Sequence, residues 1–477
     1  MADKLTPRRE DFSRWYNEIV QRAELADYSP VRGSMVIRPY GYTLWENIQA
    51  ALDRRFKATG HVNAYFPLSI PMSFLHKEKE HVEGFSPELA VVTHAGGEPL
   101  EEPLVVRPTS ETIIGHMYAQ WIKSYRDLPI LINCWNNVVR WELRTRLFLR
   151  TAEFLWQEGH TAHASAEEAE AETMQMLDVY TDFAVSDAAM PVIPGRKSNT
   201  EKFAGAVRSY TIEAMMGDKK ALQAGTSHFL GQNFARAFDM KYLDRRNDLQ
   251  YCWTTSWGLS TRMIGGIIMV HGDDQGLKLP PRLAPIQLVV VPIFKTDAEK
   301  SKVMGAIERI RALLGGEVRF KVDEREDVSP GYKFNDWEMR GVPLRMEVGP
   351  LDVDRDQVIL ARRDVPGKAG KSPAPQAGLR DRVHELLDTI QADIYRAALA
   401  FRDANIHQPV AYADFKAVVE DGFARVWWAG DDADELKIKE ETRATIRCIP
   451  IEQPGGEGKC FYTGKPATEM AIFGRAY

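Results

Sequence analysis

The sequence predicts an α+β protein of several domains whose largest part is built from β-strands. The chain has 477 residues, which is enough for two to four domains that each bury a core. From residue 130 to about 272 the pattern is mostly that of strands, with a helical interruption at 165–185. After the pair Pro280–Pro281 the composition shifts to alternating strands and helices. These three observations set the fold class.

The N-terminal part begins with a predicted amphipathic helix at 42–59, and Gly60 is a plausible stop. Its apolar side chains recur every fourth position on one face: Leu44, Ile48, Leu52 and Phe56. Prolines punctuate the extended segment that follows, up to residue 71. The sequence AGGE at 95–98 indicates the tip of a hairpin.

The second half of the chain divides into two smaller units. Predicted strands are 286–294, 318–322, 344–348 and 357–361, and predicted helices are 296–314 and 330–340. A loop rich in Pro, Gly and Lys at 366–378 precedes a long helix that ends near residue 403. The predicted domains are therefore 1–284, 285–405 and 406–477.

Composition excludes several classes of protein. The net charge of −6, with 61 basic and 67 acidic residues, does not indicate a nucleic-acid partner, so any such partner needs a local basic patch. The N-terminal segment is charged and lacks the apolar core of a secretory signal. Apolar runs such as 288–291 are too short to cross a membrane. Four cysteines without a CxxC pair indicate a reducing, cytoplasmic setting.

The stretch RWELRTRLFLRTAEFLWQEGH, residues 140–160, combines four arginines, three glutamates and two tryptophans with an apolar centre. Residues two apart on a strand share a face, so we expect Arg140 and Glu142 to point the same way. Trp156 and Glu158 should share a face on the returning strand. Alone, the stretch fits a surface hairpin with cross-strand salt bridges equally well.

Two distant segments add to this pattern. RPTSET, residues 107–112, holds a hydroxyl and a carboxylate at Thr109 and Glu111, although a helix N-cap would have the same residues. In residues 256–274, Arg262 stands where a short strand enters an apolar helix. The alternative there is a core helix with one arginine that reaches solvent along its apolar stem.

Together these segments resemble the class II aminoacyl-tRNA synthetases, and closely the prolyl-tRNA synthetase family. Residues 40–71, 138–163 and 256–274 are similar to the first, second and third class II motifs. RPTSET, WQEGHTAHA and residues 221–235 and 271–285 are similar to the prolyl type. The resemblance implies an antiparallel class II sheet flanked by helices, then an α/β anticodon-binding domain and a small α/β C-terminal domain.

The resemblance also implies a reaction and its partners. Such enzymes activate L-proline with ATP to prolyl-adenylate, release pyrophosphate and transfer proline to tRNA(Pro). Mg²⁺ should bridge the phosphates. The first motif builds a two-fold interface in relatives, so a cytoplasmic homodimer is implied.

The family's functional residues can be carried over by position. Arg140 matches the arginine that holds the α-phosphate and the substrate carboxylate, and Arg262 matches the one that holds the far end of ATP, a role that suits forked guanidinium groups. Further positions that match nucleotide contacts are Glu142, Thr151, Ala152, Gln223, Thr226 and Ser260.

Proline recognition is implied by a second set. Thr109 and Glu111 match the acceptors for the secondary ammonium group, and the residues that match the pocket around the ring are Trp156, Glu158, Phe203 and His228. Glu338 and Arg345 match positions that read anticodon bases, although ordinary helix and strand surface explains them equally well. Relatives often carry lysine where this chain has Leu351.

Two alternatives to a prolyl enzyme follow from the same residues. A non-catalytic binding module with this fold would have lost the phosphate arginines or the ammonium acceptors, but all of them are present. A threonyl or seryl enzyme is the next alternative. Threonyl enzymes hold the substrate hydroxyl with zinc, and RPTSET and its neighbourhood contain no cysteine.

Two departures from relatives concern editing and zinc. Residues 164–255 leave no room for the editing insertion that some prolyl enzymes carry. The C-terminal unit of many relatives holds zinc through four cysteines, but here 427–435 contains no cysteine and 458–467 contains only Cys460. We expect no structural zinc, and instead apolar packing that includes Trp427, Trp428, Phe461 and Phe473. The terminal Tyr477 should reach back towards the active site.

Overall fold

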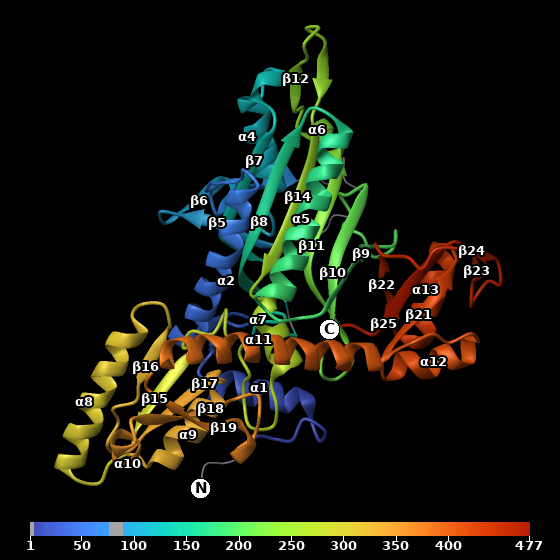
Figure 1. Ribbon diagram of the computed structural model, residues 1–477. Helices are drawn as coiled ribbons and strands as arrows, with labels where there is room; N and C mark the ends of the chain where they lie inside the picture. The colour runs from blue at the N-terminus through green and yellow to red at the C-terminus, as the bar shows by residue number, and fades with distance from the viewer. Residues whose placement is uncertain (1–3, 76–88, 143) are drawn as a thin grey trace.

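The computed structural model describes residues 4–75, 89–142 and 144–477. Its centre is an eleven-stranded sheet in the order β20-β21-β25-β22-β9-β10-β11-β14-β8-β7-β3 (Figure 1). The strands that the first domain contributes to this sheet, called the core here, are β3 (Val62–Asn63), β7 (Ile130–Val139), β8 (Glu153–His163), β9 (Val192–Arg196), β10 (Arg208–Met215), β11 (Ala221–Gly231) and β14 (Trp253–Ser260). All neighbours in this part pair antiparallel except β3 and β7. The predicted antiparallel core is confirmed.

Helices cover this sheet and close its apolar core. The helices α2 (Pro39–Ala58) and α5 (Ala166–Ser186) correspond to the two that the apolar pattern predicts. They pack with α1 (Phe12–Arg22) and α7 (Arg262–His271) in one large cluster. The predicted apolar face of α2 is at most 1% exposed. This face is therefore buried within its own chain.

Several shorter strands and helices complete the first domain around the large sheet. A three-stranded sheet contains β4 (Ser69–Pro71), β5 (Ala90–Ala95) and β6 (Glu98–Val106), which confirms the predicted hairpin tip. Helix α4 (Glu111–Trp121) follows it, and η1 (Tyr125–Asp127) leads into β7. Two further two-stranded sheets pair β1 (Ala26–Tyr28) with β2 (Met35–Ile37) and β12 (Lys241–Leu243) with β13 (Leu249–Tyr251). The short helix α6 (Asn233–Ala237) follows β11.

The strand that leads into the charged stretch is shorter than expected. It ends at Val139, whose N–H donates to Arg107 O at 3.0 Å, so the backbone turns to the 107–108 segment there. Arg140 and Glu142 lie beyond the strand, and the argument that placed both on one strand face is wrong. On the returning strand β8, Trp156 and Glu158 are two residues apart and share a face, as predicted.

The second domain combines parallel and antiparallel pairing. Its sheet has the order β16-β15-β17-β18-β19, with β15 (Leu288–Pro292), β16 (Phe320–Val322) and β17 (Leu344–Val348) parallel. Its helices are α8 (Asp297–Leu314), α9 (Pro330–Met339) and α10 (Pro350–Asp354). β18 (Gln357–Arg362) is antiparallel to β17 and β19 (Lys371–Pro375). The segment predicted as a loop thus holds η2 (Gly367–Gly370) and an edge strand, where prolines are tolerated because one side makes no ladder bonds.

The C-terminal unit extends the core sheet. Its strands are β20 (Ile406–His407), β21 (Phe423–Trp428), β22 (Thr445–Pro450) and β25 (Glu469–Gly474), with the small hairpin β23 (Gly458–Lys459) and β24 (Pro466–Ala467). β22 pairs with β9 of the core, where Ile449 faces Arg196. Helix α11 (Leu379–Ala404) runs from the second domain to this unit, which also contains α12 (Tyr412–Glu420) and α13 (Asp432–Thr442) (Figure 1).

Aromatic side chains form much of the apolar centre of the C-terminal unit. Phe461 lies 5.8 Å from Phe473, and Trp428 lies 5.4 Å from Phe473, between ring centroids. This packing was predicted, but Trp427 lies outside the cluster and covers Gly458 instead. Among the described helices, none combines the length and the apolar character needed to cross a membrane.

Candidate functional site

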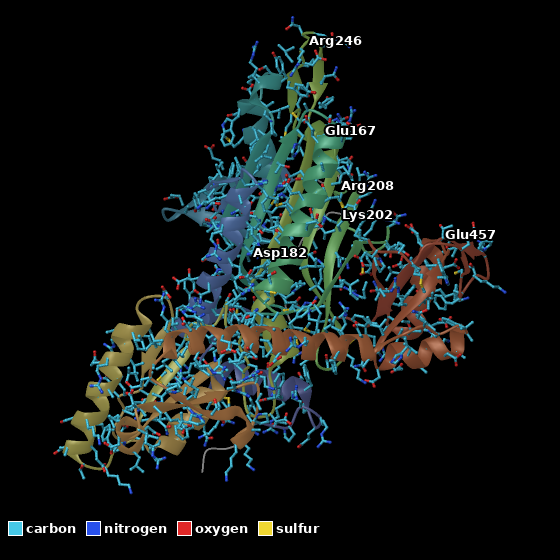
Figure 2. The ribbon with its side chains drawn as sticks, viewed as in Figure 1. Glu167, Asp182, Lys202, Arg208, Arg246 and Glu457 are labelled. Carbon is cyan, nitrogen blue, oxygen red and sulfur yellow. The ribbon has the colours of Figure 1, made fainter. Side chains whose placement is uncertain are left out.

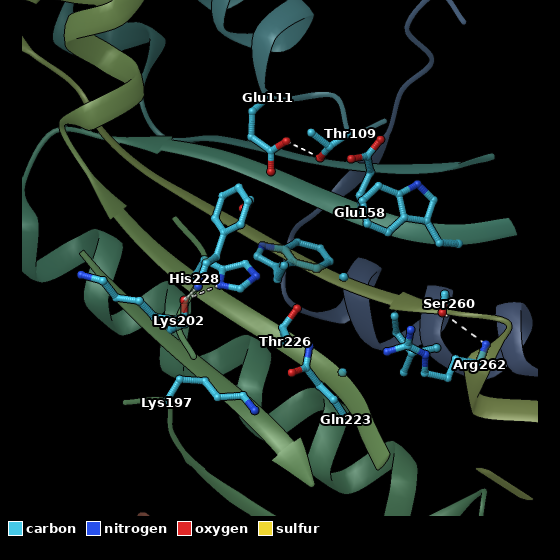
Figure 3. Close-up of a pocket in the computed structure, with 18 of the residues that line it drawn as sticks. Thr109, Glu111, Glu158, Lys197, Lys202, Gln223, Thr226, His228, Ser260 and Arg262 are labelled. Atoms are coloured by element: carbon cyan, nitrogen blue, oxygen red, sulfur yellow. Dashed lines mark hydrogen bonds between the residues drawn. The ribbon is translucent and has the colours of Figure 1, made fainter. Parts of the chain in front are cut away.

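Two adjoining cavities lie on one face of the core sheet. The first has a volume of about 510 Å³, and the second, of about 220 Å³, shares Arg140, Phe154, Ser260 and Arg262 with it. Predicted site residues that line the first cavity are Thr109, Glu111, Arg140, Trp156, Glu158, Phe203, Gln223, Thr226, His228, Ser260 and Arg262. Glu142 and Thr151 line the second. Segments far apart in the sequence therefore meet at one place (Figure 3).

Acidic side chains gather at one end of the first cavity, where α4 begins. Thr109 Oγ1 donates to Glu111, and Ser110 Oγ donates to Glu158. Ser110 is the N-cap of α4 but makes no capping hydrogen bond with its side chain. The hydroxyl groups of Thr109 and Ser110 thus bond to carboxylates and not to the helix terminus. Glu111 is 7% exposed, which places its charge in a poorly hydrated environment.

Glu158 is held by several donors. Asn136 Nδ2 donates to it at 2.8 Å, and His160 Nε2 lies 3.0 Å from its other oxygen. Burial raises the pKa of Glu158, but the hydrogen bonds with His160, Ser110 and Asn136 outweigh burial and lower it. The carboxylate is therefore ionised and fixed in orientation.

Arg140 stands between the acidic end and the second cavity. Its Nε donates to Pro108 O at 2.9 Å. Its guanidinium lies 5.6 Å from the ring centre of Phe154 and 5.3 Å from that of Trp156, within the range of cation–π attraction. Burial lowers the pKa of Arg140, and the nearby charges of Glu111 and Glu158 oppose that shift. An arginine remains protonated in such a site, so the cavity holds a rigid positive charge.

An apolar wall faces the acidic end. The rings of Phe203 and His228 are 5.1 Å apart between centroids. Ser209 Oγ accepts from the N–H of Phe203 at 3.1 Å and lies 2.8 Å from His228 Nδ1. Burial, and then the charge of Arg140, lower the pKa of His228 to about 3, so the imidazole is neutral near pH 7. Together with Trp156, these rings suit a small apolar group.

A second arginine lies at the other end. Arg262 opens α7; its N–H bonds to Ser260 Oγ at 3.2 Å, and its Nε donates to Leu149 O at 3.1 Å. Burial lowers the pKa of Arg262, as do the charges of Arg140 and Arg150. Glu142 pairs with Arg150 beside it. Two arginines that line both cavities make a site for a group with several negative charges.

One predicted nucleotide residue lies outside both cavities. The N–H of Ala152 donates to Gly33 O at 2.8 Å, and its C=O accepts from the N–H of Arg140 at 2.8 Å. Its backbone groups are thus used within the chain, and its nucleotide contact stays a prediction.

The sequence reasoning missed several lining residues. Phe154 and His160 lie on β8 at the same alternate positions as Trp156 and Glu158, so the strand pattern could have found them. Lys197 and Lys202 lie on the segment between β9 and β10, where no local pattern marks them.

The two predicted anticodon residues meet in the second domain. Arg345 Nη1 donates to Glu338 at 2.9 Å, and Arg345 also pairs with Glu347 at 3.1 Å. The guanidinium lies 4.1 Å from the ring centre of Phe334. Leu351 is 69% exposed.

Comparisons with known proteins match all three parts of the chain. Residues 93–271 match the model "tRNA synthetase class II core domain (G, H, P, S and T)", residues 287–372 match "Anticodon binding domain", and residues 412–477 match "Prolyl-tRNA synthetase, C-terminal".

Individual proteins are similar over almost the full length. A "Proline--tRNA ligase" of Roseiflexus castenholzii is 62% identical over 475 residues, which cover 99% of each chain. A "Proline--tRNA ligase, chloroplastic/mitochondrial" of Arabidopsis thaliana is 58% identical over 99% of this chain and 88% of that protein. The crystal structure of prolyl-tRNA synthetase from Cryptosporidium parvum with halofuginone and AMPPNP matches with a TM-score of 0.93 and 37% identity, covering 99% of this chain and 97% of that one.

Proposed function

Because this chain belongs to the prolyl-tRNA synthetase family and is an ATP-dependent proline–tRNA ligase, we propose that its two cavities bind proline and ATP side by side, joined at Arg140. The predicted family, fold class and activity are confirmed, and the alternatives of a binding module or a threonyl or seryl enzyme are set aside. The observation that carries the proposal is that Arg140 lines both cavities.

Arg140 is the proposed link between the two substrates. In activation the proline carboxylate attacks the α-phosphorus and pyrophosphate leaves, a reaction that needs positioning and charge stabilisation more than a nucleophilic side chain. The guanidinium is fixed by Pro108 O and two aromatic rings, so it can hold the carboxylate and one phosphate oxygen without reorganisation.

The acidic end is the proposed site of the proline ammonium group. Thr109 Oγ1 uses its hydrogen on Glu111, so its lone pairs and a Glu111 oxygen can accept the two N–H groups. The ring would then lie among Trp156, Phe203 and neutral His228. Glu158 already accepts three hydrogen bonds, so we assign it to holding this end in place.

The nucleotide is proposed to occupy the end with Arg262. Glu142 and Thr151 would lie near the base, and Gln223, Thr226 and Ser260 nearer the ribose and phosphates. Within residues 4–75, 89–142 and 144–477, no group of three or more His, Cys, Asp or Glu side chains could hold a metal ion. We propose that Mg²⁺ would be held mainly by the phosphates and water, and that the side-chain oxygens of Gln223 and Thr226, which line the first cavity, would be its protein ligands. Mg²⁺ would neutralise phosphate charge.

Recognition of tRNA(Pro) is proposed to involve Glu338 and Arg345. Their side chains pair with each other, and that of Glu338 is 36% exposed while that of Arg345 is 9% exposed. A base edge could exchange for one of these hydrogen bonds, because both groups carry directional donors or acceptors.

A panel of amino acids tests the proposed proline pocket. We expect proline to drive exchange of pyrophosphate into ATP, and alanine to drive it at lower kcat/KM, because each missing methylene is worth only about 1–3 kcal/mol in an apolar pocket. Residues 164–255 form α5, α6 and the strands from β9 to the start of β14, all of them part of the core or of its small hairpin. We therefore expect the chain not to deacylate alanyl-tRNA(Pro). Rapid hydrolysis of that ester, or exchange driven better by another amino acid, would contradict the pocket assignment.

We also propose a homodimer through the region that follows α2. Val62, Tyr65 and Leu68 are 61%, 74% and 38% exposed, and β3 is an edge of the large sheet. Such an apolar edge suits a two-fold contact. We expect light scattering at micromolar concentration to give twice 54.0 kDa, and Tyr65→Glu to weaken the dimer. Tyr28→Glu, at another half-exposed tyrosine, is the control; a fully active wild-type monomer would refute the dimer.

The C-terminal unit is proposed to fold without structural zinc, in a chain that works in the cytoplasm. Cys448 and Cys460 are both buried free thiols. Burial raises the pKa of Cys448 to about 12, which opposes the thiolate that zinc requires. We expect metal analysis of the purified chain to find less than about 0.1 zinc per chain after chelation, with unchanged unfolding temperature. One zinc per chain that survives the chelator would overturn this.

A further inference from the structure

One wall of the substrate cavity has no secondary structure of its own. Residues 197–207 join β9 to β10 as turns and bends. This segment contributes Lys197, Glu201, Lys202 and Phe203 to the lining. Figure 2 labels Lys202 on the side of the core that is nearest to the C-terminal unit. Because the segment has no helix or strand, contacts from neighbouring elements must set its position.

Helix α13 of the C-terminal unit supplies some of these contacts. Ser198 Oγ donates to Glu435 at 2.8 Å, and the two residues are only 8% and 3% exposed. Lys439 Nζ donates to Glu201 at 3.1 Å. Glu435 and Lys439 are four residues apart, so they share the face of α13 that lies against the wall.

A buried ion cluster connects β22 to the first residue of the wall. Glu213 on β10 accepts from Lys197 Nζ at 2.9 Å and from Arg447 Nε at 3.1 Å. The side chains of Glu213, Lys197 and Arg447 are 0%, 3% and 7% exposed. Burial raises the pKa of Glu213, but the charges of Lys197 and Arg447 outweigh it and lower the pKa. Loss of Arg447 would leave this cluster rearranged around one cation.

We propose that the C-terminal unit braces the proline pocket, and that Arg447, Glu435 and Lys439 are positioning residues for the wall at 197–203. The pairing of β22 with β9 places Arg447 beside Glu213. The wall then presents Phe203 to His228, on its other side. The inference rests on the proposed binding of proline beside Phe203. It gives the C-terminal unit a part in substrate binding through ion pairs and not through a metal.

Steady-state exchange kinetics with matched variants test this brace. Arg447→Met should raise KM for proline about tenfold or more and change KM for ATP less than about threefold, since Arg447 bonds to Glu213 behind the wall and reaches Arg262 only through its charge. Arg447→Lys should recover part of the loss. Arg425→Met is the control, because Arg425 lies on β21 of the same unit and bonds to Glu452 O within it.

A second pair keeps the test decisive if Arg447→Met does not fold. Lys439→Met should raise KM for proline about two- to threefold, the scale of an exposed ion pair. Lys416→Met should not, because Lys416 pairs with Glu441 inside the unit, and the two lysine side chains are similarly exposed, at 51% and 46%. The brace is refuted if the proline KM of Lys439→Met equals that of its control, or if proline and ATP KM rise together in Arg447→Met. If the wild-type chain did not exchange pyrophosphate with proline, that result would instead contradict the proposed proline pocket.

Discussion

Replacing Arg140 with alanine should lower kcat/KM for proline-dependent pyrophosphate exchange by at least about 10²-fold, the scale for removing one donor that is aimed at developing charge. The physical reason is that Arg140 lines both cavities and is fixed by Pro108 O and the rings of Phe154 and Trp156. Of the two arginines that line both cavities, Arg140 is the one that lies beside the acidic end, where Glu111 and Glu158 act on its charge. Most of the loss should be in kcat, since charge develops on the α-phosphate as pyrophosphate leaves.

Two further variants sharpen this experiment. Arg140→Lys keeps the charge but loses the fork that can hold two oxygens, so its activity should lie between those of wild type and alanine. Arg309→Ala is the control, because Arg309 lies on α8 of the second domain and bonds to Gly305 O of the same helix. Near wild-type exchange in Arg140→Ala would contradict the proposal that Arg140 holds the proline carboxylate and the α-phosphate.

The parts of the fold that could be predicted have a long, one-sided apolar pattern. The helices α2 and α5 each bury one face on the sheet, and repetition over about five turns makes such a pattern distinct. The pairing of β22 with β9 could not be predicted, because the residues that meet are Ile449 and Arg196, far apart in the sequence. Strand pairing depends on hydrogen bonds along the backbone, which leave little trace in side-chain type.

In the site, too, some residues could be predicted from local patterns and others could not. Trp156 and Glu158 could be placed together because alternation on a strand puts them on one face. Arg140 lines the cavity even though the strand that should carry it ends at Val139. Ala152 was assigned by position alone, and tertiary hydrogen bonds to Gly33 and Arg140 use its backbone. Lys197 owes its place to Glu213 and Arg447, which no local pattern connects.

Replacing Glu111 with glutamine should weaken proline binding strongly and selectively. Glutamine keeps the size and one acceptor oxygen but removes the charge that faces the proline ammonium group. Hydrogen bonds to charged groups contribute about 1.5–3 kcal/mol, so we expect kcat/KM for proline to fall by about 10- to 100-fold. The loss should be mainly in KM for proline, because the ammonium group does not change charge during activation. KM for ATP should change little.

Glu153→Gln provides the matched control for Glu111→Gln. Glu153 lies at the start of β8, is exposed and accepts from Asn137 Nδ2 at 2.8 Å, but it does not line the first cavity. Thr109→Val should show a smaller loss than Glu111→Gln, because it removes a neutral acceptor and the hydrogen bond that orients Glu111. If Glu111→Gln raised KM for ATP as much as KM for proline, its effect would run through Arg140, whose charge Glu111 also stabilises. Glu111 would then not be the ammonium acceptor, and the proline would have to bind in another orientation.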